Sequence, residues 1–135
     1  MSSGGDDKEA IRDVLAEYCF RIDDDRFAEF AALFTEDGTW ETAFGSATGR
    51  PAIEALLRRI AGEAPRPRRI HAVSNIVIRL EGDRAAVRSN WVLVQNSDAG
   101  PIVGSGGSYT DEMVKQGGAW LFRHRKIDRY VRGDE

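Results

Sequence analysis

The chain has 135 residues, of which 41% are hydrophobic and 30% are charged, and its formal net charge is -3 at pH 7. This length and composition predict one globular domain that buries about two thirds of its unfolded surface. The acidic balance disfavours nucleic acid or an anionic membrane as the main partner, because both attract basic proteins. A local cluster of Arg66, Arg68 and Arg69 lacks interleaved aromatic residues and predicts a solvated loop.

Cys19 is the only cysteine, which excludes an intramolecular disulfide and a zinc site built from Cys and His. No apolar run approaches the about 18 residues of a membrane-spanning helix, and no signal peptide is recognised. We therefore expect a cytoplasmic protein that uses no metal ion. Residues 1–7 are small, polar and acidic and predict a disordered tail, so the domain is expected over residues 8–135.

Helical spacing of apolar residues predicts the first element over residues 7–22, with one face formed by Ile11, Val14, Leu15, Tyr18 and Ile22. A second, short helix is expected from residue 26 to about residue 34. Residues 35–38 have the composition of a turn, and residues 39–44, rich in Thr and aromatic side chains, predict a short strand. Proline is favoured in the first turn of a helix, so Pro51 predicts a third helix over residues 51–60.

The period of the apolar pattern changes from helical to alternating after the proline-containing segment 65–67. The alternation predicts four strands, over residues 69–80, 85–95, 102–115 and 119–131. Helices first and an antiparallel meander second are typical of an α+β domain. We predict three N-terminal helices packed across the concave side of a strongly curved, mainly antiparallel sheet. Such a cone-shaped fold can hold a small molecule.

Two phrases of the sequence, ALFTEDGTW at residues 32–40 and GRPAIEALL at residues 49–57, carry a family resemblance. Together with the order of elements, they resemble the nuclear-transport-factor-2-like (NTF2-like) superfamily of cone-shaped α+β domains, and within it the SnoaL-like group. The resemblance covers nearly the whole chain after residue 7. It implies the fold but not the reaction, because this superfamily contains isomerases, dehydratases, cyclases, dioxygenase small subunits and non-catalytic binders.

Tyr18 and Asp23 are candidate site residues near the end of the first predicted helix. Tyr18 shares the inward face of this helix, where its phenol could hold a substrate oxygen or make one hydrogen bond in the core. Asp23 lies at the edge of the buried face, so helical geometry alone does not turn it inward. The alternative is that Asp23, Asp24 and Asp25 form a solvated acidic run. Acidic residues are unfavourable at a helix C-terminus, which indicates a further constraint on this run.

His71 is one of only two histidines, and the other, His124, has basic neighbours and is expected at the surface. Strand alternation places His71, Val73, Asn75 and Val77 on one face, and on the other face Ile70, Ala72, Ser74, Ile76, Ile78 and Leu80. The face of His71 mixes apolar and polar groups, as the walls of ligand pockets do. A structural histidine with satisfied hydrogen bonds is the alternative.

The family resemblance joins these residues into one site. In bile-acid 7α-dehydratases and hexachlorocyclohexane dehydrochlorinases, an Asp at the end of the first helix pairs with a His at the start of a strand, and scytalone dehydratases use a similar pair. The phrase IHAVSN at residues 70–75 resembles their strand, which implies an Asp23–His71 dyad with Tyr18 as a hydrogen-bond donor. In such a dyad the carboxylate fixes the imidazole tautomer and stabilises the imidazolium that forms when His71 removes a proton from carbon.

Four further residues are candidates for the pocket. Related lyases have an arginine of the last strand in the cavity, and the resemblance implies Arg125 for this role, with an exposed side chain as the alternative. Trp40, Asn75 and Trp91 are expected to line the pocket, or else to belong to the core. Ketosteroid isomerases have their catalytic aspartate where this chain has Thr42, so the resemblance does not support steroid isomerisation by that route.

These features together predict a cofactor-free lyase that eliminates water or a similar leaving group from a hydrophobic small molecule, polycyclic or aromatic. A non-catalytic ligand-binding or assembly domain is the alternative from another functional class, since relatives use the same cone in that role. An isomerase or cyclase differs from the lyase only in the fate of the carbanion, which the sequence does not show. The outer sheet face carries more apolar residues than three helices can cover, so a homodimer or homotrimer is expected.

Overall fold

The computed structural model describes residues 4–133, which form three helices and six strands. The elements follow in the order α1 (Gly4–Asp23), α2 (Phe27–Ala31), β1 (Phe34–Thr42), β2 (Gly45–Thr48), α3 (Arg50–Ala61), β3 (Arg69–Glu81), β4 (Arg84–Ser97), β5 (Gly100–Gln116) and β6 (Ala119–Arg132). Within residues 4–133, no helix is long and apolar enough to cross a membrane.

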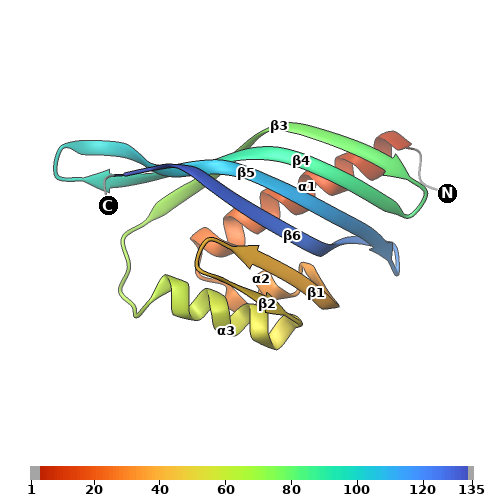
Figure 1. Cartoon of the computed structure of the whole chain (residues 1–135), viewed down its shortest axis with the longest axis horizontal. Coiled ribbons are helices and arrows are strands. Elements are labelled where there is room, and N and C mark those ends of the chain that lie inside the picture. The colour runs from red at the N-terminus through yellow and green to blue at the C-terminus, as the bar shows by residue number, and fades with distance from the viewer. Residues whose placement is uncertain (1–3, 134–135) are drawn as a thin grey trace.

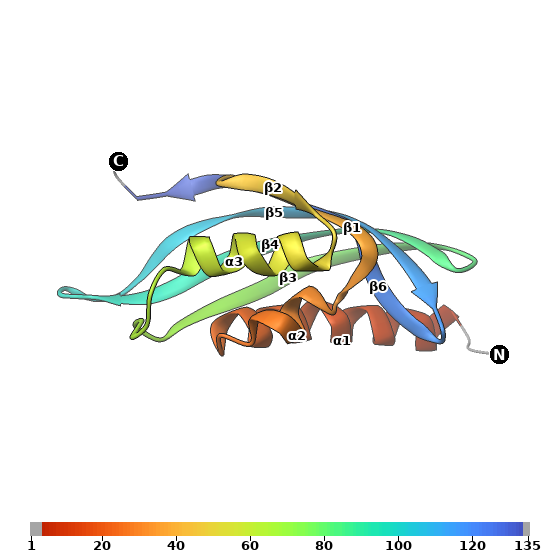
Figure 2. The same cartoon turned by 90° about the horizontal axis from the view of Figure 1, so that it is seen from below.

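The six strands form one mixed sheet in the order β2-β1-β6-β5-β4-β3. β1 and β6 run parallel, and every other neighbouring pair is antiparallel. In Figure 1, α1 lies across the long strands β3–β6, while α3 lies beside β1 and β2. Figure 2 shows the three helices on the same side of the curved sheet. The predicted α+β cone, with helices on the concave side of a mainly antiparallel sheet, is confirmed.

Aromatic side chains fill the space between the helices and the sheet. Tyr18 of α1 lies at the centre, with its ring centroid 4.7 Å from that of Phe30 and 5.8 Å from that of Phe122. Leu15 and Ile11, about one and two turns before Tyr18, are fully buried on the same face. The apolar face predicted for this helix is therefore the face that packs, at about 1.5–3 kcal/mol for each large side chain buried.

The first helix begins earlier than predicted, at Gly4 rather than Asp7. Residues 4–7 of the predicted disordered tail are therefore helical, and residues 1–3 lie outside the described residues. The Asp7 carboxylate accepts hydrogen bonds from the Lys115 ammonium at 3.0 Å and the Trp120 indole N–H at 3.1 Å. These long-range contacts hold the first turn against the sheet, which local composition alone could not indicate.

The strand after α2 also begins earlier than predicted. β1 starts at Phe34 and runs through residues 35–38, which the sequence predicts as a turn. Phe34 pairs with Phe122 of β6, and a Cβ on Gly38 would lie 3.0 Å from the backbone oxygen of Phe122. This close pairing outweighs the local turn preference. Residues 43–44 form the turn instead, and they lead into β2, which the sequence analysis missed.

A β-bulge in β3 exchanges the two predicted faces of that strand. Between Ser74 and Val77, two residues of β3 lie opposite a single residue of β4, and one of the two, Asn75, has a φ of 54°. The predicted faces hold as far as Ser74 and are wrong beyond it, because one inserted residue reverses the alternation. Ile78 is consequently buried, whereas Val77 is 56% exposed.

A second bulge in β6 has the same effect near the end of the chain. Phe122 and His124 pair with successive residues of β5, so Arg123 has no partner position in that ladder. Phe122 and Arg125 are both fully buried, although strict alternation predicts opposite faces for them. The bulge thus turns Arg125 into the interior together with Phe122.

Candidate active site

The concave side of the sheet encloses a cavity of about 490 Å³, within the usual size of a small-molecule site. Its lining is mostly apolar and aromatic and includes Tyr18, Trp40, Trp91 and Tyr109, with His71 among the polar residues. The predicted walls Trp40 and Trp91 therefore do lie at the cavity. A cavity of this kind can hold an apolar molecule beside an imidazole.

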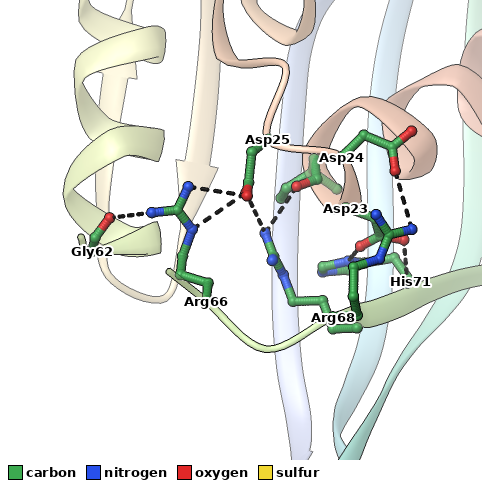
Figure 3. Close-up of polar contacts among 9 residues, drawn as sticks. Asp23, Asp24, Asp25, Gly62, Arg66, Arg68 and His71 are labelled. Atoms are coloured by element: carbon green, nitrogen blue, oxygen red, sulfur yellow. Dashed lines mark hydrogen bonds and ion pairs between the residues drawn. The ribbon is translucent and has the colours of Figure 1, made fainter. Parts of the chain in front are cut away.

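Asp23 and His71 form a close pair at the cavity wall. Asp23 is the last residue of α1, and its Oδ1 accepts a hydrogen bond from Nδ1 of His71 at 2.6 Å. Its Oδ2 accepts a second hydrogen bond, from the backbone N–H of His71, at 2.8 Å (Figure 3). An ionised carboxylate can only accept, so Nδ1 carries the proton and Nε2 keeps its lone pair. His71 lines the cavity and Asp23 lies behind it, in the order that a general base and its supporting carboxylate require.

Asp24 and Asp25 are paired with cations, although their side chains stay 40% and 36% exposed. Asp24 lies 3.4 Å from Arg68, and Asp25 lies 3.0 Å from Arg66 (Figure 3). Arg69 also lies 3.5 Å from Asp25 and donates a hydrogen bond of 2.8 Å to the backbone oxygen of the residue before Asp23. The predicted solvated loop is therefore wrong for Arg66 and Arg69, whose side chains are only 15% and 18% exposed.

This network bends the chain directly after Asp23. Asp25 adopts a φ of 58°, which ends the helix and lets the following segment turn away. Burial acts to raise the pKa of Asp25, but the hydrogen bond and charge of Arg66, together with Arg69, lower it below its ordinary value. The break fixes Asp23 as the terminal residue of α1, where its side chain reaches β3.

Tyr18 offers a hydrogen-bond donor to the cavity. Its hydroxyl oxygen accepts a 3.0 Å hydrogen bond from the indole N–H of Trp40, and both side chains are almost completely buried. No acceptor within residues 4–133 takes up the Tyr18 proton, which leaves that proton for a ligand. Burial raises the pKa of Tyr18 far above its ordinary value, so the phenol stays protonated. Tyr18 can therefore donate a hydrogen bond but does not ionise readily.

Tyr109 of β5 is a second phenol at the cavity, which the sequence analysis missed. Its ring stacks on Trp91 at 5.9 Å and meets Tyr18 edge-on at 5.5 Å. Burial raises the pKa of Tyr109 well above its ordinary value, so this phenol also stays protonated. The signal that could have found it is the alternation of Ser105, Gly107 and Tyr109, two small residues that leave space beside a large one.

Arg125 lies beneath the cavity and not in its lining. It is fully buried and forms a two-point ion pair with Asp111, at 2.8 and 3.2 Å. Its guanidinium lies over three rings, 3.5 Å from the centroid of Tyr109, 4.2 Å from that of Tyr18 and 4.5 Å from that of Phe122. The alternative of an exposed Arg125 is thus wrong, and so is its direct placement in the cavity wall. The β6 arginine that lines the cavity is Arg129.

Asn75 lies away from the site, contrary to its prediction as a pocket residue. It occupies the β3 bulge, is exposed, and donates a 2.9 Å hydrogen bond from Nδ2 to Oδ1 of Asn90. Thr42 does line the cavity, where ketosteroid isomerases would have their aspartate. The adjacent Glu41 does not, and it pairs with His124 of β6 at 3.0 Å. Among the described residues, no cluster of His, Cys, Asp and Glu could hold a metal ion.

The chain is similar to known proteins over nearly its whole length. Residues 5–126 match the model of the SnoaL-like domain. Rv3472 of Mycobacterium tuberculosis, a protein of unknown function, is 27% identical with a TM-score of 0.82, over 92% of this chain and 72% of its own. A predicted scytalone dehydratase of Novosphingobium aromaticivorans is also 27% identical, with a TM-score of 0.77 over 96% of this chain and 89% of its own.

An NTF2-like protein with a cystatin-like fold, also from Novosphingobium aromaticivorans, shares the fold at 22% identity. Its TM-score is 0.77, over 93% of this chain and 81% of its own. A search of curated proteins finds no match.

Proposed function

The chain belongs to the SnoaL-like domain family and has the NTF2-like fold, and from this premise we propose that it is a cofactor-independent lyase. The reaction would eliminate water or a similar leaving group from a hydrophobic small molecule held in the cavity. The Asp23–His71 pair carries the proposal, because a proton-bearing Nδ1 bound to a buried carboxylate leaves Nε2 as a base at an apolar wall.

In this mechanism His71 removes a proton from the carbon adjacent to the carbon that bears the leaving group. The electron pair of the broken C–H bond forms the new double bond as the bond to the leaving group breaks. Asp23 stabilises the imidazolium through the 2.6 Å hydrogen bond. For a leaving hydroxide, the proton taken up by His71 can return to it, so that water departs and the base is regenerated. Acid/base assistance of this kind contributes roughly 10²- to 10⁴-fold in rate.

Tyr18 would donate a hydrogen bond to the oxygen that gains charge during elimination. Its raised pKa suits hydrogen-bond donation rather than complete proton transfer, and Tyr109 could assist from the neighbouring strand. Arg125 would act through these phenols as a positioning residue, because its guanidinium packs on both rings. The similarity to a predicted scytalone dehydratase also supports elimination chemistry.

A substrate screen with two histidine variants tests the proposal. Cyclic and aromatic alcohols would be incubated with wild type, and loss of water followed by mass and by the ultraviolet absorbance of the new double bond. We expect His71→Asn to lower turnover roughly 10²- to 10⁴-fold. His124→Asn, which changes the only other histidine and lies outside the cavity lining, is the matched control and should retain turnover. Full turnover by His71→Asn would refute the mechanism.

A non-catalytic binding domain is the second candidate, and one observation favours it. Both Asp23 oxygens are engaged by His71, which ties the end of α1 to the start of β3 and could serve stability alone. Under that hypothesis, His71→Asn would weaken the fold and no compound would be converted. An isomerase or cyclase would use the same base, and a product of unchanged mass in the screen would identify it.

We also propose that the chain forms a homodimer or homotrimer through the outer sheet face. Exposed apolar side chains lie on neighbouring strands of that face, with exposed fractions of 62% for Ile70, 38% for Val92, 54% for Val103 and 52% for Val131. Sedimentation equilibrium measures the mass directly. A monomer at all concentrations would contradict this proposal without affecting the active site.

A further inference from the structure

The charged side chains of the cavity lining are all basic. Four arginines line it, Arg66, Arg68, Arg69 and Arg129, together with His71. No aspartate or glutamate of the described chain is among the lining residues. The charge of the cavity lining is therefore opposite in sign to the net charge of the chain, which is -3. A molecule held in the cavity thus meets arginines but no aspartate or glutamate of the described chain.

The arginines gather where the chain enters β3. Arg66 and Arg68 belong to the segment between α3 and β3, and Arg69 is the first residue of β3. The side chain of Arg68 is 81% exposed, whereas that of His71 is only 12% exposed. Exposure therefore decreases from Arg68 to His71, which places the Arg68 side chain toward the mouth of the cavity and the imidazole deeper, while Arg66 and Arg69, at 15% and 18%, are nearly as buried as His71.

The carboxylates that pair with this segment, Asp23 included, equal its three arginines in number but lie outside the cavity lining. Asp24 and Asp25 stand behind them at the end of α1, outside the lining. Arg66 and Arg69 share the single carboxylate of Asp25, at 3.0 and 3.5 Å. Arg68 has one contact of 3.4 Å with Asp24, and most of its guanidinium N–H donors remain exposed to solvent. The donors of Arg66 are engaged by Asp25 and the backbone, so Arg68 is the arginine of this segment with most donors left for a carboxylate.

The rest of the lining is mostly apolar and aromatic. Trp40, Trp91 and Tyr109 lie there, and Phe44 faces Arg129, whose guanidinium lies 5.4 Å from the Phe44 ring centroid. A ligand that fits both parts has an apolar ring body and one acidic group. Arg69 and His71 both line the cavity from the same strand and are two residues, about 7 Å, apart. The acidic group would therefore lie within a few bonds of the carbon that His71 reaches.

We propose that the substrate of this site is an organic anion. It would be an apolar ring compound whose acidic group is bound by Arg68, with the other arginines of the cavity lining nearby. The proposal deepens the lyase function and rests on it, because it takes the same cavity as the substrate site. The arginines fix the orientation of the ligand by its charged end, and the imidazole acts on its ring end. Electrostatic attraction also makes binding sensitive to salt, since Arg68 is largely exposed.

Two fluorescent probes that differ by one acidic group test the preference. Anilinonaphthalene sulfonate is the anionic probe, and phenylnaphthylamine is its neutral parent. We expect the anionic probe to bind wild type about tenfold more tightly at low salt, and the difference to shrink at about 1 M salt. Energy transfer from the wall tryptophans Trp40 and Trp91 reports that the probe occupies the cavity.

Three arginine variants identify the side chains responsible. We expect Arg68→Gln and Arg129→Gln each to weaken binding of the anionic probe by roughly three- to tenfold and to leave the neutral probe unchanged. Arg79→Gln removes the same charge from an exposed position of β3 outside the lining, and should bind both probes as wild type does. Equal affinity of wild type for the two probes, or an equal loss in Arg79→Gln, would overturn the proposal.

The preference for an anionic substrate and the lyase function can be tested separately. His71→Asn should bind the anionic probe like wild type, since the arginines are unchanged, while losing turnover. If anion preference holds and no acid is converted, the lyase function fails and the binding site stands. If neutral compounds are dehydrated with the same kcat/KM as their acidic analogues, the inference fails and the lyase function stands.

Discussion

Replacement of Asp23 by Asn tests whether the carboxylate sets the protonation of His71. In wild type both carboxylate oxygens accept from this residue, from ring Nδ1 at 2.6 Å and from the backbone N–H at 2.8 Å. An amide has only one acceptor oxygen. If that oxygen keeps the backbone N–H, the amide NH₂ faces Nδ1, so Nδ1 must accept and the proton moves to Nε2. His71 then has no lone pair to offer a substrate.

Asp23→Asn should change the free energy of unfolding and the elimination rate to different extents. The His71 and Asp23 side chains are 12% and 9% exposed, so solvent screens their hydrogen bonds little. Losing one hydrogen bond to a charged group lowers the free energy of unfolding by about 1.5–3 kcal/mol, and the variant should still fold. The elimination rate should fall roughly 10²- to 10⁴-fold, because the general base is lost in the folded enzyme.

Nitrogen NMR of the imidazole rings measures the tautomer without any substrate. The chain has two histidines, so the spectrum of His124→Asn assigns the signals of His71. We expect wild type at neutral pH to carry the proton on Nδ1 and Asp23→Asn to carry it on Nε2. A wild-type His71 with its proton on Nε2 would refute the reasoning, as would a variant that keeps both tautomer and turnover.

Three further predictions concern groups around the site. The pKa of Asp25 is lowered in the fold, so its ion pairs stabilise the protein above the ordinary aspartate value near ~4 and are lost as the pH falls through the lower folded value. The excess stability of wild type over Asp25→Asn in urea should therefore shrink below about pH 4. Arg125→Met should lower the free energy of unfolding by about 3–5 kcal/mol, because it leaves Asp111 buried without its cation, and Arg125→Met/Asp111→Leu should recover much of that loss. Tyr18→Phe should cost about 1–3 kcal/mol by leaving a buried indole N–H unsatisfied, whereas Tyr109→Phe should cost less and mainly lower turnover.

Local periodicity made most of the fold predictable. The helical spacing around Tyr18 identified the buried face of α1, and alternation around His71 identified the strand and its pocket side. The phrases at residues 32–40 and 49–57 indicated the SnoaL-like family, which the match over residues 5–126 confirms. These features depend on neighbours in the sequence, and the sequence contains them directly.

The bulges and the long-range pairs could not be predicted in the same way. A single inserted residue at Asn75 reverses the following half of β3, and nothing in strict alternation indicates where it falls. The bulge at Arg123 hides Arg125 in the core for the same reason, and it brings Arg129, not Arg125, to the cavity. The partners of Asp25 lie more than 40 positions away, so a run of acidic residues and a run of arginines each seemed solvated on its own.

The acidic C-terminus of α1 and the arginine-containing segment that leads into β3 form one ion-pair network. Three consecutive carboxylates at a helix C-terminus oppose the helix dipole, and that arrangement is stable only when cations arrive from elsewhere. Arg66, Arg68 and Arg69 supply the cations, and they do so from the segment that leads directly into His71. The contacts of this segment with α1 therefore position both the base against Asp23 and the arginines in the cavity lining. Because the same contacts build both, a substitution that frees the segment should reduce anion binding and turnover together, whereas a change at His71 should reduce turnover alone.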